Sequence, residues 1–253
     1  MSAKIKVGLI PAAGNGRRIS DLPLTRILPK PMLPILNKPI LEYVIQRMKD
    51  LGVEEVYIII GLNGQPIKDY FQDGKDFGVK INYLLQAEPN GIASAISSAR
   101  DLIKEPFTVI LGDDFTITES KNDLLTIFWE TKCIALTAVT YENNVEILKQ
   151  TNCIILDEDG RIKKTIEKPQ KPISNIRGCG IYLFRPEIFS YIDQTPHSIQ
   201  RNQKEITDTL GLVARNKRAY AAFINGININ INTKQELEKA TLLLLSLKEP
   251  TVR

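Results

Sequence analysis

The chain has 253 residues, of which 43% are hydrophobic and 25% are charged, and its formal net charge at pH 7 is +4. This length allows one large α/β domain or two small ones. So mild a charge gives no argument for nucleic-acid binding. No apolar segment reaches the length of a membrane span, and Lys4 and Lys6 interrupt the N-terminal run, so we expect a cytoplasmic protein without a signal peptide.

The cysteines and the histidine of the chain give no sign of a reactive site. Cys133, Cys153 and Cys179 lack metal-ligand spacing and lie in apolar or small-residue runs, so we expect buried structural thiols. His197 is the only histidine and follows a polar stretch, where a surface loop is expected. Chemistry that depends on histidine is therefore not expected.

Strand and helix patterns alternate through the first half of the chain. Short apolar runs predict strands at 4–10, 56–60, 79–85, 107–111 and 133–140. Periodic apolar positions predict helices at 38–52, 65–71, 91–103 and 124–130. This β-α-β repetition predicts an α/β fold with a Rossmann-like, mostly parallel sheet flanked by helices.

The second half has a different pattern. Two strands, 153–156 and 161–167, flank an Asp-Glu-Asp-Gly turn and predict a hairpin. A strand at 178–185, helices near Glu187 and Thr207, a strand at 219–223 and a helix at 233–247 follow. No repeat or linker is visible, so we expect a single domain over 1–253 with a small strand-rich insertion.

The segment from Gly8 to Ile35 predicts an anion-binding loop after the first strand, because glycines there accompany positive charge. It is not a P-loop, since no Gly-Lys-Ser or Gly-Lys-Thr follows Gly16. It also lacks the third glycine of a dinucleotide-binding loop, and the second strand ends without the acidic residue that would bind a ribose.

Six motifs occur in one order along most of the chain. They are Gly14-x-Gly16-x-Arg18 with Pro23-Leu-Thr and Pro29-Lys-Pro-Met-Leu-Pro34, then Gln86–Ala93, Leu111–Asp114, Glu167-Lys-Pro169, Asn175–Phe184 and Arg201–Asp208. Together they resemble the signature of sugar-1-phosphate nucleotidylyltransferases (NDP-sugar pyrophosphorylases), most closely glucose-1-phosphate thymidylyltransferases. The resemblance implies Mg²⁺-dependent transfer of a nucleotidyl group from a nucleoside triphosphate to a sugar 1-phosphate, giving an NDP-sugar and pyrophosphate. It favours dTTP or UTP and glucose 1-phosphate.

The resemblance implies four catalytic residues. Arg18 would grip the triphosphate and stabilise the leaving pyrophosphate, and Lys30 would neutralise charge at the α-phosphate. Lys168 would hold the sugar phosphate for in-line attack, and Asp113 would hold Mg²⁺. A phosphate monoester is already a competent nucleophile, so little need for a general base is expected.

Further residues are implied as ligands of the two substrates and the metal. The 1–140 half would bind the nucleotide, and 141–253 would bind the sugar phosphate and end in a helix. The implied nucleotide-binding residues are Ala12, Ala13, Gly14, Gly16, Arg17, Gln86 and Gly91. The implied sugar-phosphate residues are Glu167, Lys168, Asn175, Gly180 and Arg201, and the implied metal ligands are Asp113 and Asn230.

The sequence departs from the thymidylyltransferase pattern at four places. Arg17 replaces a threonine, two extra residues separate Arg18 from Pro23, Asn152 replaces a glycine, and Asn230 replaces the second metal aspartate. An amide oxygen can still ligate Mg²⁺, but more weakly and without charge. The asparagine version also resembles nucleotidyltransferases that activate N-acetylglucosamine phosphate or a molybdenum cofactor, so thymidine specificity stays open.

Two alternative functions remain open on the sequence. One is a cytidylyltransferase that acts on another phosphorylated alcohol, and the other is a non-catalytic paralogue that binds sugar nucleotides. The expected partners are a nucleoside triphosphate and a sugar 1-phosphate, with no nucleic acid and no membrane, and a homo-oligomer is left open.

Overall fold

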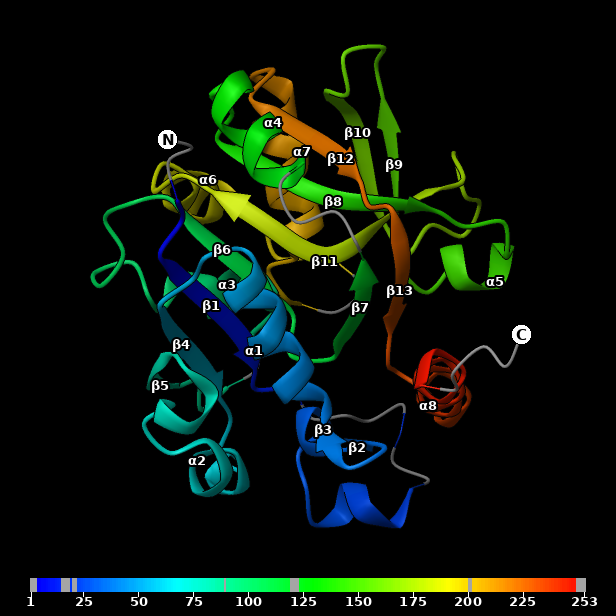
Figure 1. Ribbon diagram of the computed structural model, residues 1–253. Coiled ribbons are helices and arrows are strands. Elements are labelled where there is room, and N and C mark those ends of the chain that lie inside the picture. Colours follow the sequence, from blue (N-terminus) through cyan, green and yellow to red (C-terminus); the bar gives the residue numbers. More distant parts are fainter. Residues whose placement is uncertain are drawn as a thin grey trace.

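The computed structural model describes residues 4–14, 19, 22–88, 90–118, 123–199 and 202–248. Within them, a seven-stranded central sheet has the order β12-β8-β11-β6-β1-β4-β5 (Figure 1). Its strands are β1 (Val7–Ala12), β4 (Glu55–Ile60), β5 (Lys80–Leu85), β6 (Phe107–Ile110), β8 (Ala135–Tyr141), β11 (Ile176–Phe184) and β12 (Ala219–Phe223). The sheet thus takes strands from both halves of the chain.

The predicted mostly parallel sheet is confirmed. β1 pairs in parallel with β4 and β6, β4 with β5, and β8 with β12. β11 runs antiparallel to its neighbours β6 and β8. This reversal was not predicted, because β11 is buried on both faces and reads as the same continuous apolar run as a parallel strand.

Helices cover both faces of the sheet. One buried apolar cluster joins α1 (Ile40–Asp50), α2 (Gln65–Phe71) and α4 (Asp123–Thr131) to the sheet. A second cluster joins α3 (Ile92–Ser97), α6 (Ile188–Gln194) and α7 (Ile206–Arg215) to the opposite face. Adjacent strand residues point to opposite faces, and accordingly Leu9 belongs to the second cluster and Ile10 to the first.

Short two-stranded sheets surround the central one. β9 (Asn152–Leu156) and β10 (Ile162–Glu167) form the predicted hairpin, which stands beside β8 and β12 (Figure 1). β7 (Asp114–Thr118) pairs antiparallel with β13 (Gly226–Asn230), and β2 (Pro34–Ile35) with β3 (Lys38–Pro39). Short helices lie at Pro23–Arg26, Lys30–Met32, Lys75–Phe77 and α5 (Val145–Leu148).

A third apolar cluster fixes the C-terminal helix α8 (Lys234–Lys248) below β13. Ala240 of α8 packs there with Phe115 of β7, Ile229 of β13 and Ile35 of β2. These strands are far apart in the sequence, and their short lengths gave no signal of pairing. The cluster therefore links the loop that follows β1 to the end of the chain.

One predicted helix is shorter than expected. The predicted helix over 91–103 is α3, which ends at Ser97. Beyond it the backbone continues in turns, and the hydroxyl of Ser98 donates to the carbonyl oxygen of Ala95 at 2.7 Å. A serine that bonds the preceding turn in this way competes with regular helix formation.

The structure shows the state of the three cysteines and the character of the helices. Cys133, Cys153 and Cys179 are free and buried, as predicted. Among the described residues, no helix combines the length and the apolar character that crossing a membrane requires.

Candidate active site

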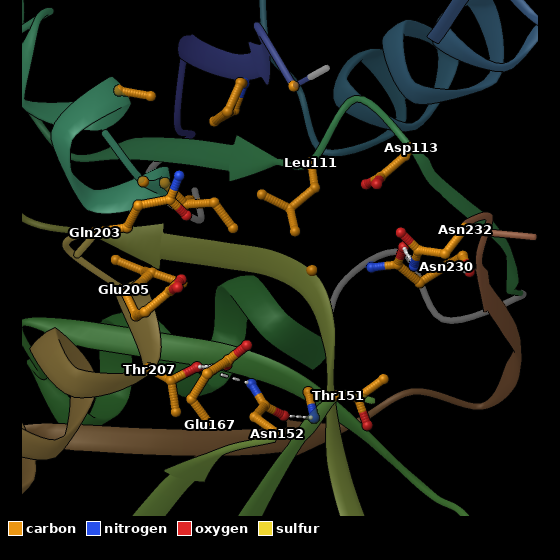
Figure 2. Close-up of a pocket in the computed structure, with 18 of the residues that line it drawn as sticks. Leu111, Asp113, Thr151, Asn152, Glu167, Gln203, Glu205, Thr207, Asn230 and Asn232 are labelled. Carbon is orange, nitrogen blue, oxygen red and sulfur yellow. Dashed lines mark hydrogen bonds between the residues drawn. The ribbon is translucent and has the colours of Figure 1, made fainter. Parts of the chain in front are cut away.

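A cavity of about 660 Å³ opens where β1 and β6 end, and α7 and the β9–β10 hairpin contribute to its other side (Figure 2). Cavities at the carboxyl ends of strands are the usual ligand sites of open α/β sheets. Residues from both halves of the chain line this one. The predicted site residues among them are Ala12, Ala13, Gly14, Lys30, Gln86, Gly91, Asp113, Glu167, Lys168, Gly180 and Asn230.

Among the described residues, Asn175 is the one predicted site residue that does not line the cavity. Asn175 lies directly before β11, and its carbonyl oxygen accepts from the Glu142 amide at 2.8 Å, which extends the β8–β11 ladder. Gly16, Arg17, Arg18 and Arg201 lie outside the described residues, so their roles stay predictions.

Small residues and backbone form one part of the cavity lining. Ala12 and Ala13 are buried at the end of β1. Gly91 has a φ of +102°, and a Cβ there would lie 2.3 Å from the carbonyl oxygen of Lys204. Only glycine fits this conformation and approach without strain. Small residues thus leave room for a flat ligand, with the Gln86 side chain at the rim.

A lysine bridges polar groups in the cavity lining. Lys30, on the short helix after β1, forms an ion pair with Asp113 and donates to Asn232 Oδ1 at 2.9 Å. Asn232 Nδ2 in turn donates to Asn230 Oδ1 at 2.5 Å. The side chains of Lys30 and Asp113 are 11% and 22% exposed, so the pair is shielded but accessible from the cavity. Figure 2 shows Asp113, Asn230 and Asn232 gathered at this point.

The oxygen donors here fit a divalent cation that is shared with a substrate. Asp113 offers a carboxylate, and Asn230 offers an amide oxygen from the adjacent end of β13. No group of three or more His, Cys, Asp or Glu side chains that could hold a metal occurs in the described part of the chain. Mg²⁺ needs no such cage, because it binds through one or two protein oxygens together with substrate phosphates.

A buried polar network lies beneath Asp113. Asp114 accepts from Thr116 Oγ1 at 2.6 Å and from Asn228 Nδ2 at 2.7 Å. Arg177 donates to the side-chain and backbone oxygens of Asn228 at 2.7 and 2.9 Å. Burial raises the pKa of Asp114 to about 7, although these two hydrogen bonds oppose the shift. The network ties β7, β11 and β13 together and so fixes Asp113 against Asn230.

The opposite end of the cavity is polar. Glu167 ends β10, and its Oε1 lies 3.6 Å from Lys168 Nζ. Lys168 has a φ of +43°, and its amide donates to the carbonyl oxygen of Thr151 at 2.7 Å. This tight backbone at the end of the hairpin brings a carboxylate and an ammonium group to one wall. Thr207 Oγ1 at the start of α7 donates to Glu167 Oε2 at 2.7 Å.

Several lining residues were not predicted as site residues. Thr207 and Glu205 line the cavity and lie within the Arg201–Asp208 motif, but only Arg201 of that motif was predicted as a site residue. Asn232 lies two residues after Asn230 and carries the bond to Lys30. Asn152 replaces a glycine of the thymidylyltransferase pattern, and in the structure it lines the cavity.

The cavity thus combines a wall of small residues and backbone, the Lys30–Asp113 pair and a polar wall with Glu167 and Lys168. Residues 7–230 match the model of the family described as nucleotidyl transferase. The chain belongs to this family, which confirms the resemblance drawn from the motifs.

Relatives cover the chain to different extents. It is 34% identical over 205 residues to the low-salt glycan biosynthesis nucleotidyltransferase Agl11 of Haloferax volcanii, a match over 80% of this chain and 56% of that protein. It therefore spans little more than half the length of that relative. It is 30% identical to a UTP–glucose-1-phosphate uridylyltransferase of Staphylococcus haemolyticus, over 99% of this chain and 95% of that protein.

The fold agrees with a solved structure of the same kind. The crystal structure of a UDP-glucose pyrophosphorylase complexed with UDP-glucose matches with a TM-score of 0.86 and 29% identity. The match covers 96% of this chain and 100% of that one.

Proposed function

We propose that the chain transfers a nucleotidyl group from a nucleoside triphosphate to a sugar 1-phosphate and releases pyrophosphate. One observation carries this proposal: the Lys30–Asp113 pair, the Glu167–Lys168 pair and the backbone around Gly91 line the same cavity. Two polyanions that must meet need cations beside them, and Lys30 and Lys168 both line the cavity.

The reaction is an in-line displacement. An oxygen of the sugar phosphate forms a bond to the α-phosphorus, and the bond from that phosphorus to the bridging oxygen of the β-phosphate breaks. The electron pair of the broken bond leaves with pyrophosphate. Positioning and charge stabilisation suffice for such a step.

Five residues of the cavity lining have roles in the proposed reaction. Gly91 and Gln86 bound the space for the base, and Lys30 neutralises charge at the α-phosphate. Lys168 holds the sugar phosphate, and Glu167 accepts hydrogen bonds from sugar hydroxyls. Residues 1–140 thus bind chiefly the nucleotide, and residues 141–253 chiefly the acceptor.

Asp113 and Asn230 are the residues that would hold Mg²⁺. Bound there, the ion would neutralise phosphate charge in the transition state. Lys30 already pairs with Asp113, so the ammonium group is poised to move from the carboxylate to the phosphates when they enter.

UTP and glucose 1-phosphate are the first substrates to test. The uridylyltransferase relative covers nearly the whole chain, and the matching structure holds UDP-glucose. dTTP is the second choice, on the motif resemblance. Agl11 is named only as a nucleotidyltransferase and adds no substrate.

The test is pyrophosphate release in a grid of five nucleoside triphosphates against several sugar 1-phosphates with Mg²⁺, with product masses measured. We expect the mass of an NDP-sugar, with the highest rate for UTP and glucose 1-phosphate. A grid without any nucleotide-sugar mass, in protein that still binds UTP, would contradict catalysis and favour a sugar-nucleotide-binding paralogue. Phosphocholine with CTP, added to the grid, tests the cytidylyltransferase alternative.

A further inference from the structure

The acceptor end of the cavity contains an asparagine that closes off part of its volume. Asn152 is the first residue of β9 and stands opposite Glu167 in the register of the β9–β10 hairpin. The residue is 8% exposed and lines the cavity together with Thr207 and Gly178. Figure 2 shows its side chain between Thr151 and the side chains of Thr207 and Glu167.

Hydrogen bonds fix the position of the Asn152 amide. Its Oδ1 accepts from the backbone amide of Gly178 at 2.7 Å, and its Nδ2 lies 3.4 Å from Thr207 Oγ1. Thr207 then donates to Glu167 Oε2 at 2.7 Å. The Gly178 amide can only donate, and the Glu167 carboxylate accepts. Each hydrogen bond of the series is therefore donated in the same direction, from Gly178 through Asn152 and Thr207 to Glu167.

Packing holds the side chain equally firmly. A Cβ built on Gly178 would lie 3.0 Å from Asn152 Nδ2 and 3.1 Å from Oδ1, so the amide lies directly on the glycine backbone. The space into which a side chain at Gly178 would project is therefore occupied by the Asn152 amide, although Gly178 itself still lines the cavity.

We propose that Asn152 is a specificity-determining residue that restricts the acceptor to sugar 1-phosphates bearing a hydroxyl, and not an acylated amine, at the carbon facing β9. An asparagine side chain has about as many heavy atoms as an acetyl group. An acetyl group directed at Gly178 would have to displace the amide and break its bonds to Gly178 and Thr207. This inference rests on the proposed function.

The same network gives Asn152 a second effect. Because Asn152 Nδ2 bonds Thr207, and Thr207 bonds Glu167, the amide orients the carboxylate that is proposed to receive sugar hydroxyls. A hydroxyl-bearing acceptor thus meets a Glu167 carboxylate that is already oriented. Loss of the Asn152 amide should change both the shape of the cavity and the orientation of that carboxylate.

The test compares two acceptors in the wild-type protein and in Asn152→Gly. The probes are glucose 1-phosphate and N-acetylglucosamine 1-phosphate, each with UTP, and UDP-glucose and UDP-N-acetylglucosamine for binding by calorimetry. We expect the wild type to favour the glucose compounds at least about tenfold in kcat/KM, and the variant to shift this ratio by about tenfold toward the acetylated ones. Asn152→Ala should give a smaller shift in the same direction. Because a ratio of two acceptors is compared, a general loss of folded protein cancels.

The matched control is Asn82→Gly, which also replaces an asparagine in a strand but does not line the cavity. It should leave the acceptor ratio unchanged. Turnover by both Asn152 variants with the wild-type ratio would overturn this inference and leave the proposed function standing. Absence of turnover and of nucleotide-sugar binding in the wild type would overturn the proposed function, and this inference with it.

Discussion

Asp113 is the residue on which the proposed chemistry depends most. Its carboxylate pairs with Lys30 and faces the cavity, while the buried network below it is carried by Asp114. Neighbouring aspartates therefore have separate tasks, one in the site and one in the support of the site.

Replacing Asp113 by alanine should remove activity without removing the fold. We expect kcat/KM to fall at least about 100-fold, as when an electrostatic group at a reacting centre is lost. The circular dichroism spectrum should stay that of the wild type, since the side chain is not part of the core. Asp101→Ala, at an exposed turn, is the control. Full activity of Asp113→Ala would disprove the metal-site assignment.

Asp114 makes the stability of the protein depend on pH. Its pKa is raised by burial to about 7, above the ordinary value of 3.8, so the folded protein holds a proton that the unfolded chain releases between those values. The free energy of unfolding should therefore fall as pH rises from about 4 to about 7, by at most about 1.4 kcal/mol per unit from this group.

Asp114→Asn should flatten that dependence. An asparagine can accept from Asn228 and donate to Thr116, so the network can persist without the titrating group. Urea unfolding between pH 4 and 8 measures the slope in both proteins. An identical slope in wild type and variant would show that Asp114 does not titrate in this range.

The start of α8 secures the residues next to the metal site. Glu236 Oε2 accepts from the amides of Asn232 and Thr233 at 2.7 and 2.8 Å, and Thr233 Oγ1 accepts from the Glu236 amide at 3.3 Å. This reciprocal pattern is a capping box. It connects the C-terminal helix to Asn232, and through Asn232 to Lys30.

Glu236→Ala should lower the free energy of unfolding by about 1 to 2 kcal/mol, because it removes the cap. Glu238→Ala is a matched control on the same helix. Within the described part of the chain Glu238 forms an exposed pair with Lys234 at 3.6 Å, and its loss should cost less than about 1 kcal/mol. Urea unfolding of both variants gives the comparison, and equal losses would contradict the capping role.

The segment before α3 requires glycine at one position. Gly91→Ala should cost about 1 to 3 kcal/mol, since φ is +102° and the new Cβ would collide with the Lys204 backbone. It should also weaken UTP binding, because relief of the collision moves the wall beside Gln86. Calorimetry with UTP measures this, with Ser94→Ala on the same helix as control. An unchanged affinity for UTP would mean that the nucleotide base does not bind beside Gly91.

For the molecule as a whole, regular patterns made most elements predictable. The apolar runs gave the strands of the parallel part, and the 157–160 turn gave the β9–β10 hairpin. The direction of β11 and the β7–β13 pair could not be predicted, because the first depends on topology and the second joins segments about a hundred residues apart.

Site residues could be predicted where they belong to a sequence motif. They could not be predicted where only tertiary contacts bring them to the cavity. Lys30, Asp113, Glu167 and Lys168 came from motifs and do meet in one cavity. Asn152 gained its place from its contacts with Gly178 and Thr207, which no local pattern reveals. Asn175 also came from a motif, but it does not line the cavity, and its role stays a prediction.

The most direct measurement follows the oxygen atoms of the acceptor. The protein is supplied with Mg²⁺, UTP and glucose 1-phosphate whose phosphate oxygens are all ¹⁸O, and the masses of both products are determined. Attack by the sugar phosphate on the α-phosphorus predicts UDP-glucose that retains every labelled oxygen, together with unlabelled pyrophosphate. Label in the pyrophosphate, or labelled inorganic phosphate released from the sugar, would contradict nucleotidyl transfer to a sugar 1-phosphate.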